Sequence, residues 1–286
     1  MNEARGNMRG SWILCCFLQV SISSVLYAQV KFNLVGSETV KTRLELYKGN
    51  DRVREMALLR TFADAGCPAS NLSEQAVPKT KEPNVICVLP GETAEIVLVG
   101  AHFDHVPEGK GIVDNWSGAS LLPSLFQSLA GSKHKHTFVF VGFTGEESGE
   151  VGSGFYVSKL SKIEASQIGL MVTLDSIGLG PTKVWASRSD KYAVNLLGAT
   201  AHALNLPLAV VNVDGYGESD EEPFIKRNVK TITIHSVTTE TSRVLHTALD
   251  APAAISFHDY YDTYHLLAGY LAVLDIRLDV DPAEPH

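Results

Sequence analysis

The sequence has few cysteines, no basic cluster and no clean apolar run long enough to cross a membrane. Only four of its 286 residues are cysteine and no Cys-x-x-Cys pair occurs, which argues against a zinc site built from thiolates. Lysine and arginine number 24 against 32 aspartates and glutamates, so the formal net charge is −8. Nucleic acid and anionic membrane surfaces are therefore not expected partners.

Several common catalytic motifs are also missing. The chain contains no His-Glu-x-x-His zinc motif and no Gly-x-Ser-x-Gly nucleophile elbow. The segment Gly178-Leu-Gly180-Pro lacks the third glycine of a dinucleotide-binding loop. The missing motifs argue against a zinc protease with two ligands on one helix, a serine hydrolase and a nicotinamide enzyme.

The composition is that of a soluble globular protein, with 45% hydrophobic and 20% charged residues. At the N-terminus, Met8-Arg9 precedes a mainly apolar stretch from Trp12 to Tyr27 and then Ala28-Gln29. This pattern predicts a secretory signal peptide over residues 1–28, followed by one catalytic domain over residues 29–286. We therefore expect a secreted or periplasmic protein without a membrane span.

Removal of that signal would leave Cys67 and Cys87 as the cysteines of the mature chain. An oxidising compartment would allow a disulfide between them. Two separate buried thiols are the alternative, and the sequence leaves both open.

Segments typical of strands alternate with segments of helical periodicity, which predicts a mixed, mostly parallel sheet covered on both faces. The helical segments are 37–47, 51–65, 115–130 with an interruption near Pro123, 152–160, 190–204, 220–227 and 261–278. The strand-like segments are 85–89, 95–101, 137–143, 169–174, 183–186, 208–213 and 231–235.

Three of the apolar runs lead directly into residues that bind metals. Parallel strands deliver the side chains at their carboxyl ends to one edge of a sheet, so these residues are expected to meet. Imidazole and carboxylate oxygen are ligands that zinc prefers, and a site with more than one ion is the simplest reading. The runs are 95–101 before His102, 137–143 before Glu146 and Glu147, and 169–174 before Asp175.

Four blocks together resemble the zinc aminopeptidases of metallopeptidase family twenty-eight, which include bacterial leucyl aminopeptidases and aminopeptidase Y. They are His102-Phe-Asp104, Asp114-Asn-Trp-Ser-Gly118, Gly145-Glu146-Glu147 and Asp175-Ser-Ile-Gly178, in the order of that family. The resemblance covers roughly residues 85–278 and implies a three-layer α/β/α fold of the zinc-dependent exopeptidase type.

The resemblance also implies a role for each residue. Asp114 would bridge two zinc ions, His102 and Asp175 would complete one ion, and Glu147 with a C-terminal histidine would complete the other. Glu146 would be the general base that takes a proton from water and passes it to the leaving amine. Asp104 would orient His102 without binding the ion itself, since ligand histidines usually need such a partner.

The C-terminal part offers four candidates for the last histidine ligand: His235, His246, His258 and His265. His258 is preferred because His258-Asp-Tyr-Tyr-Asp262-Thr263 matches the family pattern, in which Asp-Thr opens the last helix. His265 is the alternative, and His246 is expected to be an ordinary surface or packed residue. His134 and His136 are expected in a solvated turn.

In the resemblance, residues Ser219 to Phe224 form the Ser-Asp-His-x-x-Phe substrate segment. Glu221 stands where the family commonly has histidine, which puts the chemistry of the pocket in doubt. Tyr216 and Phe257 are candidate walls of the substrate pocket.

The sequence thus predicts a secreted, zinc-dependent aminopeptidase that acts on peptides with a free N-terminus and uses two ions. A glutaminyl-peptide cyclotransferase is the first alternative, since it has the same fold with one zinc ion. A non-catalytic binding ectodomain is the second, although such a relative should have lost ligands that this chain retains. Side-chain preference and oligomeric state remain open.

Overall fold

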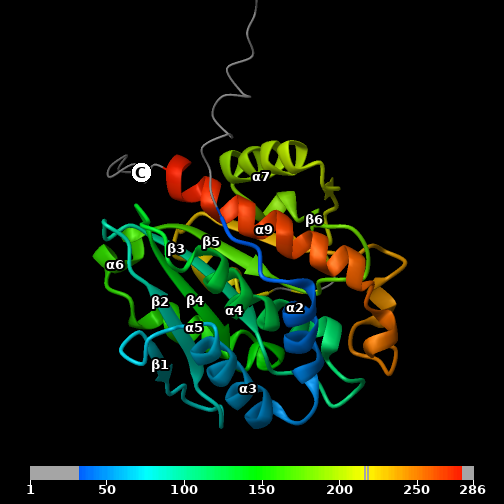
Figure 1. Cartoon of the computed structure of the whole chain (residues 1–286). Helices are drawn as coiled ribbons and strands as arrows, with labels where there is room; N and C mark the ends of the chain where they lie inside the picture. The colour runs from blue at the N-terminus through cyan, green and yellow to red at the C-terminus, as the bar shows by residue number, and fades with distance from the viewer. Residues whose placement is uncertain (1–31, 216, 218, 279–286) are drawn as a thin grey trace, which may run out of the picture. The chain divides into compact units, whose positions relative to one another are not determined.

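Eight strands form one mixed sheet in the part of the chain that the computed structural model describes, residues 32–215, 217 and 219–278 (Figure 1). The strand order is β1-β2-β4-β3-β5-β8-β6-β7. Pairs β1–β2, β2–β4 and β6–β8 are antiparallel and the other four are parallel, so the expected mixed, mostly parallel sheet is confirmed. The strands are β1 (Leu72–Gln75), β2 (Asn84–Leu89), β3 (Ile96–His102), β4 (Thr137–Phe143), β5 (Ile168–Leu174), β6 (Lys183–Val184), β7 (Ala209–Val210) and β8 (Thr231–His235).

Helices cover both faces of the sheet. Successive residues of a strand point to opposite faces, so neighbouring residues pack against different helices. On β4, Phe140 packs edge-on against Phe126 of α4, while Val139 and Val141 join the cluster that holds Val157 of α5 and Phe224 of α8. In Figure 1, α4, α2 and α9 lie in front of the sheet. The helices are α2 (Ser37–Leu44), α3 (Asp51–Asp64), α4 (Ser117–Leu129), α5 (Val151–Lys159), α6 (Lys162–Gln167), α7 (Lys191–Leu204), α8 (Glu222–Ile225) and α9 (Phe257–Arg277).

Helix α9 begins four residues earlier than the sequence pattern predicts. The side chain of Ser256 accepts a hydrogen bond from the Asp259 N–H and caps the helix, so the first helical residue is Phe257 and not Tyr261. Pro123 does not interrupt α4, since that helix is buried along nearly its whole length and its packing outweighs one lost backbone bond. Strand β1 and helix α6 were not predicted.

The two cysteines of the described chain form a disulfide, Cys67–Cys87. The bond joins the residues just after α3 to strand β2, across a sequence separation of 20. A closed loop of that size stabilises a fold by about 3 kcal/mol in the chain-entropy model. No helix within the described ranges is long and apolar enough to cross a membrane. The signal peptide predicted for residues 1–28 lies outside the described residues and stays a prediction.

His134 and His136 are buried, which corrects the expectation of a solvated turn. They contact the C-terminal turn of α9, where Asp275 Oδ2 lies 3.4 Å from His134 Nδ1 and Asp275 Oδ1 accepts the His136 N–H at 2.9 Å. His134 Nε2 donates to the Leu129 carbonyl at 2.8 Å. The hydrogen bond to Asp275 raises the pKa of His134, and despite burial the bonds to both histidines hold the pKa of Asp275 well below its usual range.

This contact should make stability depend on pH. The lowered pKa of Asp275 stabilises the fold above pH ~3.9, and this contribution is lost as the pH falls through the folded value. The raised pKa of His134 stabilises it below pH ~6.5, a contribution lost as the pH rises through the folded value. The Asp275→Asn variant should therefore lose about 1 kcal/mol near pH 5.5, where both charges of the pair are present, and less at pH 9. Urea unfolding at both pH values measures the difference, with the exposed Asp64→Asn as control. An equal loss at both values would contradict the charge effect.

Candidate metal centre and adjoining pocket

Four neighbouring parallel strands, β4, β3, β5 and β8, end at the same edge of the sheet and deliver the candidate residues there. His102 is the last residue of β3, and Glu146 with Glu147 lies in a short helical turn after β4. Asp175 follows β5, and His246 lies in the long loop after β8. The predicted meeting of strand ends therefore occurs, and the C-terminal histidine at this edge is His246.

Asp114 is presented by an irregular segment between β3 and α4. Asp114 and Asn115 have non-helical backbone angles, so the chain turns sharply before α4 begins. The Asn115 amide donates to the Leu174 carbonyl at 2.8 Å and its oxygen accepts the Gly118 N–H at 3.0 Å, which fixes the segment against the end of β5. A Cβ at Gly118 would lie 2.5 Å from the Leu174 carbonyl oxygen, so only glycine permits this approach.

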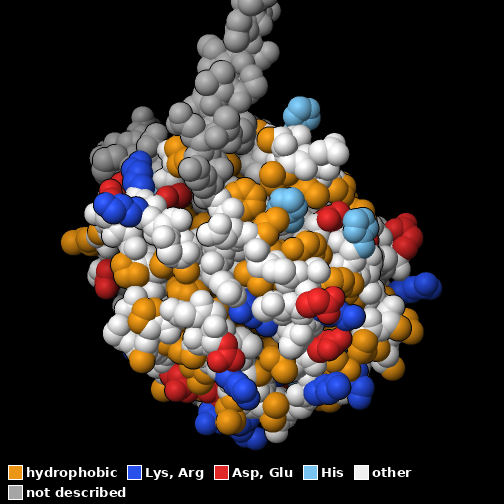
Figure 2. Space-filling model, viewed as in Figure 1, with side chains coloured by type: hydrophobic (Ala, Val, Ile, Leu, Met, Phe, Trp, Pro, Cys, Tyr) orange, Lys and Arg blue, Asp and Glu red, His pale blue; other side chains and the backbone are white. Residues whose placement is uncertain are grey.

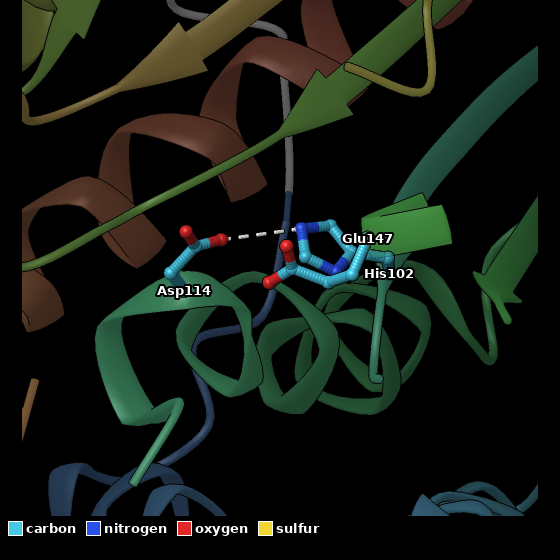
Figure 3. Close-up of side chains that lie close together, drawn as sticks. All are labelled: His102, Asp114 and Glu147. Carbon is cyan, nitrogen blue, oxygen red and sulfur yellow. Dashed lines mark ion pairs between the residues drawn. The ribbon is translucent and has the colours of Figure 1, made fainter. Parts of the chain in front are cut away.

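The Asp114 carboxylate lies between two imidazoles. Its Oδ1 is 3.3 Å from His102 Nε2, the pair marked by the dashed line in Figure 3, and its Oδ2 is 3.1 Å from His246 Nε2. Each carboxylate oxygen thus faces a different imidazole, which is the arrangement expected of a carboxylate shared by two ions.

The other carboxylates lie near one or other of these two imidazoles. Glu147 Oε2 lies 3.1 Å from His246 Nε2. Asp175 Oδ1 lies 4.0 Å from His102 Nε2, while its Oδ2 accepts a hydrogen bond from the Ser219 hydroxyl at 2.6 Å. Glu146 Oε2 lies 3.7 Å from His102 Nε2.

These groups fit zinc by geometry and by their unused bonding capacity. Two ligands bound at ~2.0–2.1 Å to a tetrahedral ion are about 3.3 Å apart, close to the separations of Asp114 from both imidazoles. His102 Nδ1 faces the Asp104 carbonyl at 3.2 Å and must donate to it, which leaves the Nε2 lone pair free. His102 Nε2 and Glu147 Oε1 are buried without a hydrogen-bond partner, although buried polar atoms normally have one.

The electrostatics also favour a bound cation. Burial and the charge of Asp114 raise the pKa of Glu147 to about 7, and burial also raises the pKa of Glu146 and of Asp175. The bond to Asp114 raises the pKa of His246 to about 9. Several carboxylates so close together repel one another, and a divalent cation removes that repulsion.

Asp104 holds the Glu146–Glu147 turn more directly than it holds the His102 ring. Its Oδ1 accepts the Glu146 N–H at 3.1 Å and its Oδ2 accepts the Glu147 N–H at 3.2 Å. The His102 ring is oriented mainly by the Asp104 backbone carbonyl, since the nearest carboxylate oxygen is 3.6 Å from Nδ1. The expected supporting role of Asp104 therefore extends to both glutamates.

The structure places His246, and not His258, at the candidate metal centre. His258 lies in the first turn of α9 with its side chain 85% exposed, and its nearest carboxylate is Asp262 at 3.6 Å. The early start of α9 explains this correction, because it places His258 on the helix and not in a loop before it. His265 is partly buried beside Phe32. The segment His246-Thr-Ala-Leu-Asp250 has the same His-to-Asp spacing as His258 to Asp262 and was the signal available for His246.

A cavity of about 250 Å³ opens onto the candidate metal centre. Its polar end includes Asp114, Glu146, Asp175 and His246. Its other walls combine the apolar side chains of Trp185, Val213, Val237 and Leu245 with small or polar residues, among them Ser219, Thr233, His235 and Ser242.

Tyr216 and Phe257 were the predicted pocket walls, and His235 was one of the candidates for the last histidine ligand. His235 lines the cavity with both ring nitrogens satisfied, Nε2 by the Val211 carbonyl and Nδ1 by the Val237 N–H, and burial lowers its pKa to about 4, so the ring is uncharged at neutral pH. Phe257 packs on Tyr260 and Tyr261 and is not among the residues that line the cavity. Tyr216 lies outside the described residues.

Two buried acids follow Ser219, which lines this pocket. Asp220 and Glu221 are fully buried, and none of their carboxylate oxygens has a hydrogen-bond partner. Burial raises the pKa of Asp220 to about 8 and that of Glu221 to about 7. Arg188 lies 3.9 Å from Glu221 and stacks over the Trp185 ring, so the residue that departs from the resemblance is linked to a pocket wall.

One curated relative is "Probable leucine aminopeptidase 2" of Arthroderma benhamiae, which is 32% identical over 149 residues. The alignment covers 49% of this chain and 30% of the fungal protein, so the chain spans about a third of that relative's length.

Solved structures share the fold. The zinc aminopeptidase of Bacillus subtilis superposes with a TM-score of 0.61 at 24% identity, covering 68% of this chain and 50% of that chain. A glutaminyl cyclase from an Acidobacteriales bacterium superposes with a TM-score of 0.68 at 17% identity, covering 84% and 94%. At such identities the likeness shows the fold alone.

The family comparison covers the residues that form the candidate centre. The model of peptidase family M28 matches residues 84–270, which include every strand end described above and His246. The match extends over more than half of the sequence, and the chain therefore belongs to peptidase family M28.

Proposed function

We propose that this protein is an aminopeptidase that uses two zinc ions to hydrolyse the first peptide bond of its substrates. One observation carries the proposal: each oxygen of the Asp114 carboxylate faces a different imidazole, and a pocket opens beside the same carboxylate. A carboxylate that held one ion through both oxygens would not direct each of them to a different imidazole.

The residues would hold the ions in two sets that share Asp114. His102 and Asp175 would hold one ion, and Glu147 and His246 the other. Bound zinc would polarise the scissile carbonyl and make the attacking water more acidic. His102 would keep its lone pair toward the ion because its Nδ1 proton is engaged by the Asp104 carbonyl.

Glu146 is proposed to move the proton. Its carboxylate lines the pocket, and its backbone N–H is fixed by Asp104 at 3.1 Å. Burial raises its pKa, which suits a group that must first accept a proton from water and then give it to the leaving amine.

The pocket supports a preference for peptides with an apolar N-terminal residue. Its volume of about 250 Å³ suits one side chain, and its far walls offer aliphatic and indole surfaces without a charged group. The cationic amino group of a free N-terminus would lie at the acidic end, beside Glu146 and Asp175. Peptides with a free N-terminus are thus the proposed substrates.

Metal removal tests this proposal. Dialysis against a chelator should abolish hydrolysis of leucyl anilide, and about two equivalents of zinc should restore it. A panel of aminoacyl anilides should rank leucine and methionine above lysine and glutamate. Full activity in metal-stripped protein would refute a zinc hydrolase. Release of pyroglutamate from an N-terminal glutaminyl peptide, with one zinc ion bound, would favour the cyclotransferase. Tight zinc binding without turnover on any of these substrates would favour a binding ectodomain.

We also propose that the chain is exported. The apolar stretch from Trp12 to Tyr27 has the pattern of a signal peptide, and the Cys67–Cys87 disulfide suits an oxidising compartment. N-terminal sequencing of the mature protein should begin at Gln29.

Figure 2 shows basic and acidic side chains interspersed over the face that it draws, without a large basic patch for nucleic acid.

A further inference from the structure

Asp250 connects the two loops that carry the candidate ligands Asp114 and His246. Its Oδ1 accepts the N–H groups of Ile112 at 2.9 Å and Val113 at 2.8 Å, and its Oδ2 accepts the Asp114 N–H at 3.1 Å. The two aspartates are 136 positions apart in the sequence. A single buried carboxylate therefore joins a segment near the end of β3 to the loop after β8.

The backbones of the two loops also meet around this carboxylate. Lys110 N–H donates to the Asp250 carbonyl at 2.7 Å, and the Asp250 N–H donates to the Thr247 carbonyl at 3.0 Å. A Cβ at Gly109 would lie 2.3 Å from the Thr247 carbonyl oxygen, so glycine is required there for the loops to approach. The segment 109–114 and the segment 246–250 form one packed unit.

His246 depends on such an anchor because its own side chain is poorly packed. The imidazole is 58% exposed, and the backbone of His246 has a φ of 56°, a left-handed conformation that few residues other than glycine adopt. Such a conformation persists where the surrounding structure imposes it. Asp250, which is only 1% exposed, lies four residues away and is held by three N–H groups.

We propose that Asp250 is a positioning residue for the metal centre: it sets the distance between Asp114 and His246 and so determines how tightly the ion between them is held. Asp250 itself binds no metal, because its oxygens are already occupied by backbone donors. The inference rests on the proposed two-zinc function.

The test compares Asp250→Asn, Asp250→Ala and the control Asp262→Asn in the full chain. Zinc affinity is measured by competition with a chromophoric chelator, and the site is probed by the visible absorption of the cobalt-substituted protein. The amide of Asn can still accept from Ile112 and Val113 but places an NH₂ group opposite the Asp114 N–H. The Asn variant should bind the ion held by Glu147 and His246 about 10- to 100-fold more weakly, as for residues that orient ligands. The other ion should weaken less, because His102 and Asp175 do not depend on Asp250. The Ala variant should lose more.

The cobalt spectrum separates positioning from general destabilisation. Asp250→Asn should change the absorption of one cobalt site while Asp262→Asn leaves both unchanged. Equal weakening of both ions, or unchanged affinities and spectra in a folded Asn variant, would overturn the inference. If the wild-type protein itself binds no zinc, the proposed function fails instead, so the two failures are distinguishable without any assay of activity.

Discussion

Replacing His246 with alanine should remove one zinc ion and nearly abolish peptide hydrolysis. His246 Nε2 lies 3.1 Å from both Asp114 Oδ2 and Glu147 Oε2, so the substitution would leave two carboxylates without their imidazole partner. A catalytic ion contributes several kcal/mol to the transition state, and its loss should lower kcat/KM by about 10³-fold. Zinc content by mass spectrometry and anilide hydrolysis measure the two effects.

His258→Ala is the matched control. The His258 side chain is 85% exposed on α9, and its ion-pair partner is Asp262, which lies outside the candidate metal centre. The variant should therefore keep two ions and normal turnover. The opposite pattern, with His258→Ala inactive and His246→Ala normal, would return the last ligand to the position that the sequence pattern favours.

The second large effect is expected at the two adjacent glutamates. Glu146→Gln should bind both ions and a substrate-like inhibitor but lose about 10²- to 10⁴-fold in kcat, because an amide cannot accept the proton. Glu147→Gln should instead lose affinity for one ion, since a neutral amide is a poor zinc ligand, and added zinc should partly restore its rate.

The contacts of the two side chains support this division. Glu147 Oε2 is within 3.1 Å of the His246 imidazole, whereas Glu146 Oε2 comes no closer than 3.7 Å to His102. If Glu146→Gln lost an ion while Glu147→Gln lost only rate, the two roles would be reversed. Near-normal rates in both variants would mean that the reaction takes place elsewhere.

The disulfide and the buried histidines show the limits of local patterns. Whether Cys67 and Cys87 pair depends on the end of α3 lying beside β2, a distance that sequence separation does not contain. His134 and His136 lie in a polar, lysine-containing segment typical of a turn, yet the C-terminal turn of α9 covers them and supplies Asp275 as partner. In both cases the deciding contact comes from an element distant in the sequence.

Local sequence patterns were enough to predict the alternating architecture and most residues of the candidate centre. Short apolar runs that lead into His102, Glu146 and Asp175 favour buried strands, and parallel strands bring their carboxyl ends together. Which of the four C-terminal histidines lies beside them depends on long-range contacts that local patterns do not contain. His246 and His258 have the same spacing to an aspartate. Ser256 caps α9 early and so places His258 on the helix, whereas Asp250 accepts the Asp114 N–H and holds the His246 loop beside Asp114. Long-range contacts of this kind leave no periodicity in the chain, because they join segments that the fold alone brings into reach.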